Sequence, residues 1–195
     1  MENNNGARSW SDNINFIIAV CAVLISAASF YATYLQAESS EKQVKAMTLP
    51  LLDFEHSNWD TETNSYRLQL KITNAGAGPA ILHRAEFVYR GQQFADLRAI
   101  IKACCQENYT DFLATTDVAK RRYTVNAPLQ NAILPGLQEL TFFEVVDQDN
   151  SHPFWQQFET VRFAINAKLC YCSLLGDCYQ SQGITNVVEV DQCAE

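Results

Sequence analysis

Seven cysteines are the residues of this chain with the most chemical potential. Thiols form disulfides, coordinate soft metal ions and undergo redox exchange. Cys21 lies in an apolar stretch, where it is most simply a small apolar residue. The other six are Cys104, Cys105, Cys170, Cys172, Cys178 and Cys193. An even set of this density is typical of a domain that folds in an oxidising compartment.

Cys172 and Cys178 are the strongest candidates for a disulfide. If residues 173–177 form a hairpin loop, the two cysteines face one another at about the 5.5 Å Cα separation that a disulfide requires. Cys104 and Cys105 are neighbours, and a bond between them would strain the connecting peptide, so we expect at least one of them to reach a distant partner. The further possible disulfide cysteines, whose connectivity the sequence does not select, are Cys104, Cys105, Cys170 and Cys193.

Other uses of the same cysteines stay open. Cys170, Cys172 and Cys178, with one further cysteine, offer enough ligands for a metal ion. Their spacing departs from the paired Cys-x2–4-Cys pattern of zinc sites. Unpaired thiols in a reducing compartment and a redox role are the remaining alternatives. A structural disulfide is the favoured interpretation.

No other set of residues specifies a reaction. His56, His83 and His152 lie far apart in the sequence, and no recognised nucleophile motif accompanies any of them. Acidic residues gather at 53–62 and 147–149, but neither segment has the spacing of a calcium-binding loop, so both are expected to be solvated. We therefore expect a protein that is not an enzyme, with no catalytic, metal or cofactor-binding residues and no cofactor.

An apolar stretch near the N-terminus must position whatever follows it. Ile14 to Leu35 is a run of 22 residues without a charged side chain, and as a helix it would cover the ~30 Å hydrocarbon core of a bilayer. Residues 26–28 (Ser-Ala-Ala) resemble a signal-peptide cleavage site. The preceding segment has one basic residue, Arg8, and apolar character continues past Ala28. A retained anchor is therefore favoured over a cleaved signal or a buried helix.

The chain divides into four parts. Residues 1–13 form a polar tail, residues 14–35 the transmembrane helix, and residues 36–49 a juxtamembrane helical stalk rich in helix formers. Pro50 ends the helix. Residues 50–195 form one folded domain of a size that supports a single core.

The folded domain reads as mainly β. Apolar and polar residues alternate over residues 66–73 and 161–172, as expected for strands with one buried face, and residues 137–146 are expected to form a further strand. Residues 94–105 break this rhythm with the 3–4 residue spacing of a short amphipathic helix, and residues 178–190 return as the last strand. About seven short strands predict an antiparallel, immunoglobulin-like β-sandwich with a short helical insertion.

Two motifs carry a family resemblance. Asn74-Ala-Gly76-Ala-Gly78-Pro-Ala is a glycine-rich bend between two strands, and Leu134-Pro-Gly is a strand-entry turn. With the N-terminal anchor, these motifs resemble bacterial single-pass membrane-anchored proteins whose β-sandwich domain has an Asn-x-Gly-x-Gly-Pro-Ala bend. The resemblance implies the architecture and carries no catalytic residue.

The net charge and the charges that flank the apolar stretch limit the classes of partner and the cellular location. The formal net charge is −8, from 22 acidic and 14 basic residues, and without a basic stripe this excludes nucleic acid as a partner. Lysines and arginines flanking the apolar stretch lean weakly towards a cytoplasmic C-terminal domain, but the cysteines lean the other way and carry more weight. The expected location is the bacterial inner membrane, with the C-terminal domain in the periplasm. Small residues at 26–29 offer a surface for homo-oligomers through the anchor helix.

The favoured function is a membrane-tethered, non-enzymatic interaction module with an unknown protein partner. It would include the case of a small subunit in a membrane or envelope assembly. The alternative is a cysteine-dependent redox or metal-binding protein.

Overall fold

The computed structural model describes residues 5–183 and 186–193, with side chains from residue 14 onward. The chain divides into two compact units, one up to Ala46 and one from Met47 onward. The helices are α1 (Asn5–Thr48), α2 (Leu97–Ala114), α3 (Pro153–Val161) and the 3-10 helix η1 (Arg162–Ala164). The strands are β1 (Leu52–Asp60), β2 (Ser65–Asn74), β3 (Ala80–Tyr89), β4 (Gln92–Phe94), β5 (Arg122–Asn126), β6 (Ala132–Leu134), β7 (Glu139–Asp147), β8 (Ile165–Ser173), β9 (Cys178–Ser181) and β10 (Val187–Val190).

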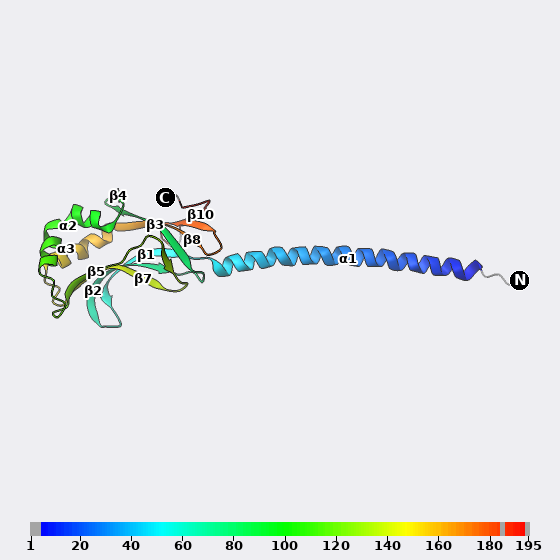
Figure 1. Ribbon diagram of the computed structural model, residues 1–195, viewed down its shortest axis with the longest axis horizontal. Helices are drawn as coiled ribbons and strands as arrows, with labels where there is room; N and C mark the ends of the chain where they lie inside the picture. The colour runs from blue at the N-terminus through cyan, green and yellow to red at the C-terminus, as the bar shows by residue number, and fades with distance from the viewer. Residues whose placement is uncertain (1–4, 184–185, 194–195) are drawn as a thin grey trace. The chain divides into compact units, whose positions relative to one another are not determined.

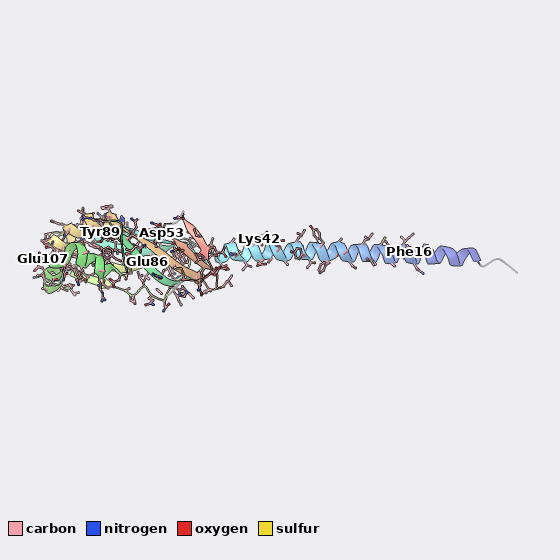
Figure 2. The ribbon with its side chains drawn as sticks, turned by 90° about the horizontal axis from the view of Figure 1, so that it is seen from above. Phe16, Lys42, Asp53, Glu86, Tyr89 and Glu107 are labelled. Atoms are coloured by element: carbon pink, nitrogen blue, oxygen red, sulfur yellow. A yellow bond between two sulfur atoms is a disulfide. The ribbon has the colours of Figure 1, made fainter. Side chains whose placement is uncertain are left out.

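Helix α1 is continuous over 44 residues and includes both the apolar stretch and the polar segment after it. From Ile14 onward it is long and apolar enough, by length and composition, to cross a membrane, and its apolar window is not buried by the rest of the chain. Figure 2 shows Phe16 and Lys42 projecting from this helix, one from its apolar part and one from its polar part. On the polar part, Lys42 forms an ion pair with Glu38, one helical turn away, at 2.7 Å. The expected long N-terminal apolar helix is thus confirmed.

Two antiparallel sheets form the folded unit (Figure 1). One has the strand order β1-β2-β7-β5; the other has the order β10-β9-β8-β3-β4, with β6 also paired to β3. The prediction of a mainly β, antiparallel domain with a helix is confirmed. More strands form than the sequence indicated, because β4 and β6 have three residues each and show no alternation, and because the predicted final strand divides into β9 and β10.

The alternation in the sequence does place the core. Leu68, Leu70 and Ile72 of β2 are at most 1% exposed, and the polar residues between them lie on the opposite face of the sheet. Phe87 of β3 and Phe142 of β7 bring the two sheets together, with ring centroids 5.6 Å apart. Burial of these apolar side chains supplies the main stabilisation of the domain.

The helical parts are longer than expected. Helix α2 continues to Ala114, and the carboxylate of Asp96 caps its first turn by accepting a hydrogen bond from the Ala99 N–H at 2.8 Å. The strand predicted from residue 161 begins only at Ile165, because residues 161–164 complete α3 and form η1. Phe163, which the alternation placed on the buried face, is therefore 64% exposed.

The two motifs of the sequence meet around one buried side chain. The Asn74 amide is fully buried, and its oxygen accepts hydrogen bonds from the N–H groups of Leu51 (3.1 Å) and Gly76 (3.0 Å). Its nitrogen donates to the carbonyl of Gly78 at 2.8 Å and to the carbonyls of residues 134–135 at 3.2 and 3.1 Å. Asn74 therefore joins the start of β1, the glycine-rich bend and the Leu-Pro-Gly turn.

Candidate functional site

Two neighbouring disulfides link β8 to the segments that follow it. Cys172 and Cys178 are joined across the hairpin that links β8 to β9, with Cα atoms 4.0 Å apart. Cys170 is joined to Cys193, with Cα atoms 5.6 Å apart, so the segment after β10 is tied to β8. The hairpin loop is closed by a 2.8 Å hydrogen bond from the Ser173 N–H to the Asp177 carbonyl. This is the loop geometry on which the pairing of Cys172 with Cys178 was predicted.

Cys104 and Cys105 depart from the expectation that one of them reaches a distant partner. They are bonded to each other, with Cα atoms 3.7 Å apart. The backbone of α2 leaves the helical region at Cys105 (φ −145°, ψ 18°), and this local break brings the two sulfur atoms together. The sequence reasoning treated α2 as a regular helix there, and in a regular helix neighbouring side chains point in different directions.

A metal site at the cysteine cluster would require reduction. The sulfur atoms of Cys172, Cys178 and Cys193 lie within 4.8 Å of one another, a spacing that suits a shared ion. Each of these sulfurs is part of a disulfide, however, and the ligand of a zinc ion is the thiolate. The arrangement as it stands cross-links strands.

The disulfides make a simple prediction about thiol content. Denatured but unreduced full-length protein is expected to react at one thiol, that of Cys21, and at all seven cysteines after reduction. Titration with a chromogenic thiol reagent gives the number, and mass spectrometry of unreduced peptides gives the connectivity. Two or more reactive thiols before reduction, or a peptide linking Cys104 to a distant cysteine, would contradict the structure.

His56 lies in a polar cluster at the edge of the first sheet. Its Nδ1 accepts a hydrogen bond from Arg162 Nη1 at 3.0 Å, so the neutral ring carries its proton on Nε2. Arg162 is 5% exposed and forms two further hydrogen bonds, both of 3.0 Å, with the carboxylate of Glu159. Glu159 in turn accepts from Asn58 of β1 at 2.9 Å. The cluster joins β1 to the end of α3, and its polar groups are occupied with one another.

This cluster predicts a pH dependence of stability. Burial of the ring and the charge of Arg162 lower the pKa of His56 from its ordinary value of 6.5. Because the unfolded chain then binds a proton that the folded chain resists, the free energy of unfolding falls as the pH drops below about 6.5. His56→Asn keeps an acceptor for Arg162 and removes the titration, so its melting temperature should fall less than that of the wild type between pH 8 and pH 5.5.

Thermal melts of both proteins across this range measure the difference. His83→Asn, at an exposed histidine, is the matched control and should behave as the wild type. An identical pH slope for His56→Asn and the wild type would contradict the prediction.

His152 and Asp147 have structural positions. Asp147, which the sequence placed in a solvated acidic loop, ends β7 and is 1% exposed, because its carboxylate accepts from Arg122 Nε at 3.0 Å and from the His152 N–H at 2.9 Å. His152 Nδ1 accepts from the Phe154 N–H at 3.1 Å and so caps α3, while Nε2 lies 3.2 Å from Asp111. In the described parts of the chain, no serine or cysteine hydrogen-bonds to a histidine ring, so these residues do not form a nucleophile–base pair.

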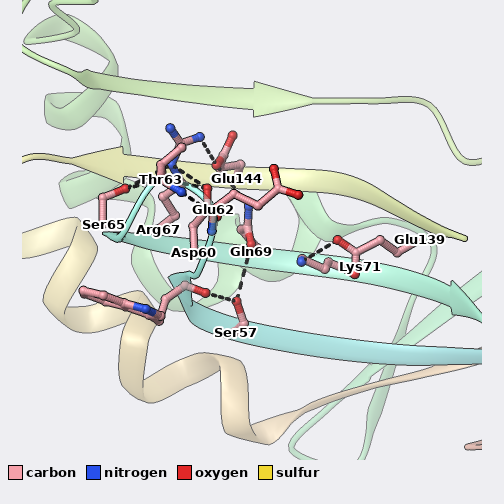
Figure 3. Close-up of polar contacts among 11 residues, drawn as sticks. Ser57, Asp60, Glu62, Thr63, Ser65, Arg67, Gln69, Lys71, Glu139 and Glu144 are labelled. Atoms are coloured by element: carbon pink, nitrogen blue, oxygen red, sulfur yellow. Dashed lines mark hydrogen bonds and ion pairs between the residues drawn. The ribbon is translucent and has the colours of Figure 1, made fainter.

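The outer face of the first sheet is a network of paired charges (Figure 3). Arg67 of β2 contacts Glu144 at 2.9 Å and Asp60 at 3.3 Å, and Lys71 contacts Glu139 at 2.7 Å. Both cations thus lie against carboxylates. This face is a polar surface that the pairs stabilise modestly.

The feature that sequence reasoning missed is an interruption in the strand pairing of β3. On one side β3 pairs with β8 from Ala80 to Tyr89, with a shift of register between Leu82 and Arg84 that leaves His83 out of the pairing. On the other side β6 pairs with residues 80–82 and β4 with residues 87–89. Residues 83–86 have no strand on that side within the described residues. Neither flanking strand was predicted, so the gap between them had no signal in the sequence.

A groove of about 990 Å³ opens at this interruption. Its walls are the middle of β3, the first turn of α2 (residues 95–98) and the loop of residues 126–131 between β5 and β6. Its lining includes apolar side chains that are buried or half-buried: Ala85, Phe87, Leu97, Ala127, Leu129 and Phe142. An apolar lining with a few polar groups at the rim is the usual composition of a binding site.

The rim of the groove is more positive than the rest of the chain. Arg84 and Arg98 line it together with His83, against the single carboxylate of Asp96, which also caps α2. Arg84 forms an ion pair with Glu86. The side chains of Arg98 and His83 are exposed and form no hydrogen bond or ion pair with the described residues. In a chain of net charge −8, the residues that line the groove have a net charge of +1, from Arg84 and Arg98 against Asp96, with histidine neutral.

The fold and the groove together define a class: a disulfide-linked, mainly β domain that follows a helix long and apolar enough to cross a membrane. No protein-family model, no curated protein and no solved structure matches the chain.

Proposed function

We propose that this protein is a membrane-tethered, non-enzymatic interaction module that binds a segment of a partner protein in the groove beside β3. The observation that carries the proposal is the groove itself, with its apolar lining and positive rim, beside a part of β3 that pairs with neither β4 nor β6. Helix α1 would hold the domain at the membrane, as expected of a small subunit in a larger membrane assembly.

The same proposal places the domain on the periplasmic side of a bacterial inner membrane. The three disulfides of the folded unit support an oxidising compartment. Alkaline phosphatase fused after the last residue should therefore be active, and a green fluorescent protein fused there should remain dark. The reverse pattern, or release of the full-length chain by alkaline carbonate, would contradict the location.

Site-specific photo-crosslinking in native membranes tests the groove as the binding site. A photoreactive amino acid at Gln130, which is exposed and lines the groove, should form a discrete adduct with one partner. The same amino acid at Gln148, which is exposed in the turn after β7, is the matched control and should form none. Equal adducts from both positions, or none from Gln130, would contradict the proposal.

A further inference from the structure

We infer that the groove takes a short, extended, acidic segment of a partner protein, which adds as a strand to residues 83–86 of β3. This inference rests on the proposed function and names the kind of segment that the same site recognises. Its basis is the register of three strands on β3, the apolar lining of the groove and the charges on its rim.

The backbone of β3 provides the first part of the argument. An unpaired strand edge presents N–H and C=O groups that recruit a further strand, and folded proteins normally keep such edges covered. Here β6 and β4 cover the two ends of the edge, and both run antiparallel to β3. The uncovered part, residues 83–86, is about 13 Å long at ~3.3 Å per residue. A bound strand of about four residues fits between β6 and β4, and a longer partner chain must turn away at both ends.

The side chains select what the added strand must carry. Successive side chains of a strand point to opposite faces. On β3, Ala85 and Phe87 belong to the face that packs on the core. Arg84 and Glu86 lie on the opposite face, where they form an ion pair. An added strand would therefore direct alternate side chains towards the apolar lining and towards the rim. A complementary segment therefore alternates apolar residues, which face the lining, with residues that face the rim.

The positive charge of the rim favours acidic residues at the positions of the bound segment that face it. Arg98 is exposed, lines the groove and has no ion-pair partner among the residues that the structure describes. Carboxylates on the bound segment would pair with Arg98 and compete for Arg84, whereas lysines would be repelled from both. A basic segment or an uncharged polar segment does not neutralise the charge of Arg98.

Peptide binding to the full-length protein in nanodiscs of zwitterionic lipid tests the inference. The probe is a fluorescein-labelled hexapeptide of alternating valine and glutamate, followed by fluorescence polarisation. We expect saturable binding that weakens at least about tenfold when glutamate is replaced by lysine. The affinity should also fall at least about tenfold when alternate peptide nitrogens are methylated, because strand addition needs their N–H groups. Equal binding of the methylated peptide would overturn strand addition.

Matched variants separate the rim from overall charge. Arg98→Glu and Lys102→Glu each change the net charge by the same amount on the same helix, and both positions are exposed. Arg98→Glu should weaken the glutamate peptide at least about tenfold, while Lys102→Glu should leave it within about twofold. Equal losses in both variants would overturn the assignment of Arg98.

Hydrogen exchange locates the bound strand. The amides of residues 83–86 should exchange more slowly with the glutamate peptide present, and those of β1, an edge strand of the other sheet, should not change. Slower exchange at 83–86 caused by anionic-lipid nanodiscs alone, without peptide binding, would overturn the inference in favour of a lipid surface.

A groove-specific adduct at Gln130 without any peptide binding would refute the acidic strand and leave the interaction module standing. Peptide binding without an adduct at Gln130 would support the strand site and count against the interaction module in the cell.

Discussion

Replacing Asn74 with alanine is expected to lower the free energy of unfolding by about 4 kcal/mol, because it leaves several buried backbone groups without partners. Asn74 is fully buried, accepts two backbone hydrogen bonds and donates to three carbonyls. Each group that loses its partner without gaining water costs about 1–3 kcal/mol. The groups around Asn74 belong to three different segments, so no single rearrangement can satisfy them all.

Chemical denaturation of the full-length protein in detergent, followed by tryptophan fluorescence, measures this loss. Asn166→Ala is the matched control, because Asn166 is exposed on β8 and should change stability by less than about 0.5 kcal/mol. Asn74→Asp should be as damaging as Asn74→Ala at neutral pH, since it sets a carboxylate against three carbonyl oxygens. A loss below about 1 kcal/mol for Asn74→Ala would refute this role.

Gly78→Ala is expected to destabilise the domain by about 3 kcal/mol or more, because the added Cβ has no space. It would overlap the carbonyl group of Thr48, which is backbone and cannot rotate away. The Gly78 N–H also donates to the Leu49 carbonyl at 3.5 Å, so the bend and the start of the domain must separate to admit a methyl group.

Gly91→Ala separates this steric effect from ordinary glycine strain. Gly91 has a positive φ of 79°, and nothing lies within 4 Å of the Cβ that alanine would add. Its cost should be that of the left-handed backbone alone, about 1 kcal/mol. Both variants are measured by the same denaturation experiment, and equal losses would show that the close approach to Thr48 is unimportant.

The interruption in the pairing of β3 lies next to the segments that Asn74 joins. The glycine-rich bend leads directly into β3, and the Leu-Pro-Gly turn ends β6, which pairs with the first residues of β3. The junction therefore holds one end of the groove in place. Destabilising substitutions at Asn74 or Gly78 are expected to reduce binding only through loss of folded protein, unlike Arg98→Glu.

Local patterns were sufficient to identify the elements whose signal is short in range. Twenty-two uncharged residues indicated the apolar helix, and period-two alternation indicated β2 and β8, because one buried face imposes that period directly on the sequence. The hairpin of residues 173–177 likewise indicated the pairing of Cys172 with Cys178, since both cysteines flank one turn.

Tertiary contacts decided the rest. Asp147 is buried because Arg122 and the backbone of His152 reach it from other elements, and the bond between Cys104 and Cys105 depends on a break inside α2. The groove depends on where β4 and β6 stop along β3, and three-residue strands are too short to leave a period in the sequence. Residue order determined the long apolar helix and the alternating strands of this protein. Its groove exists only through the spacing between segments that meet after folding.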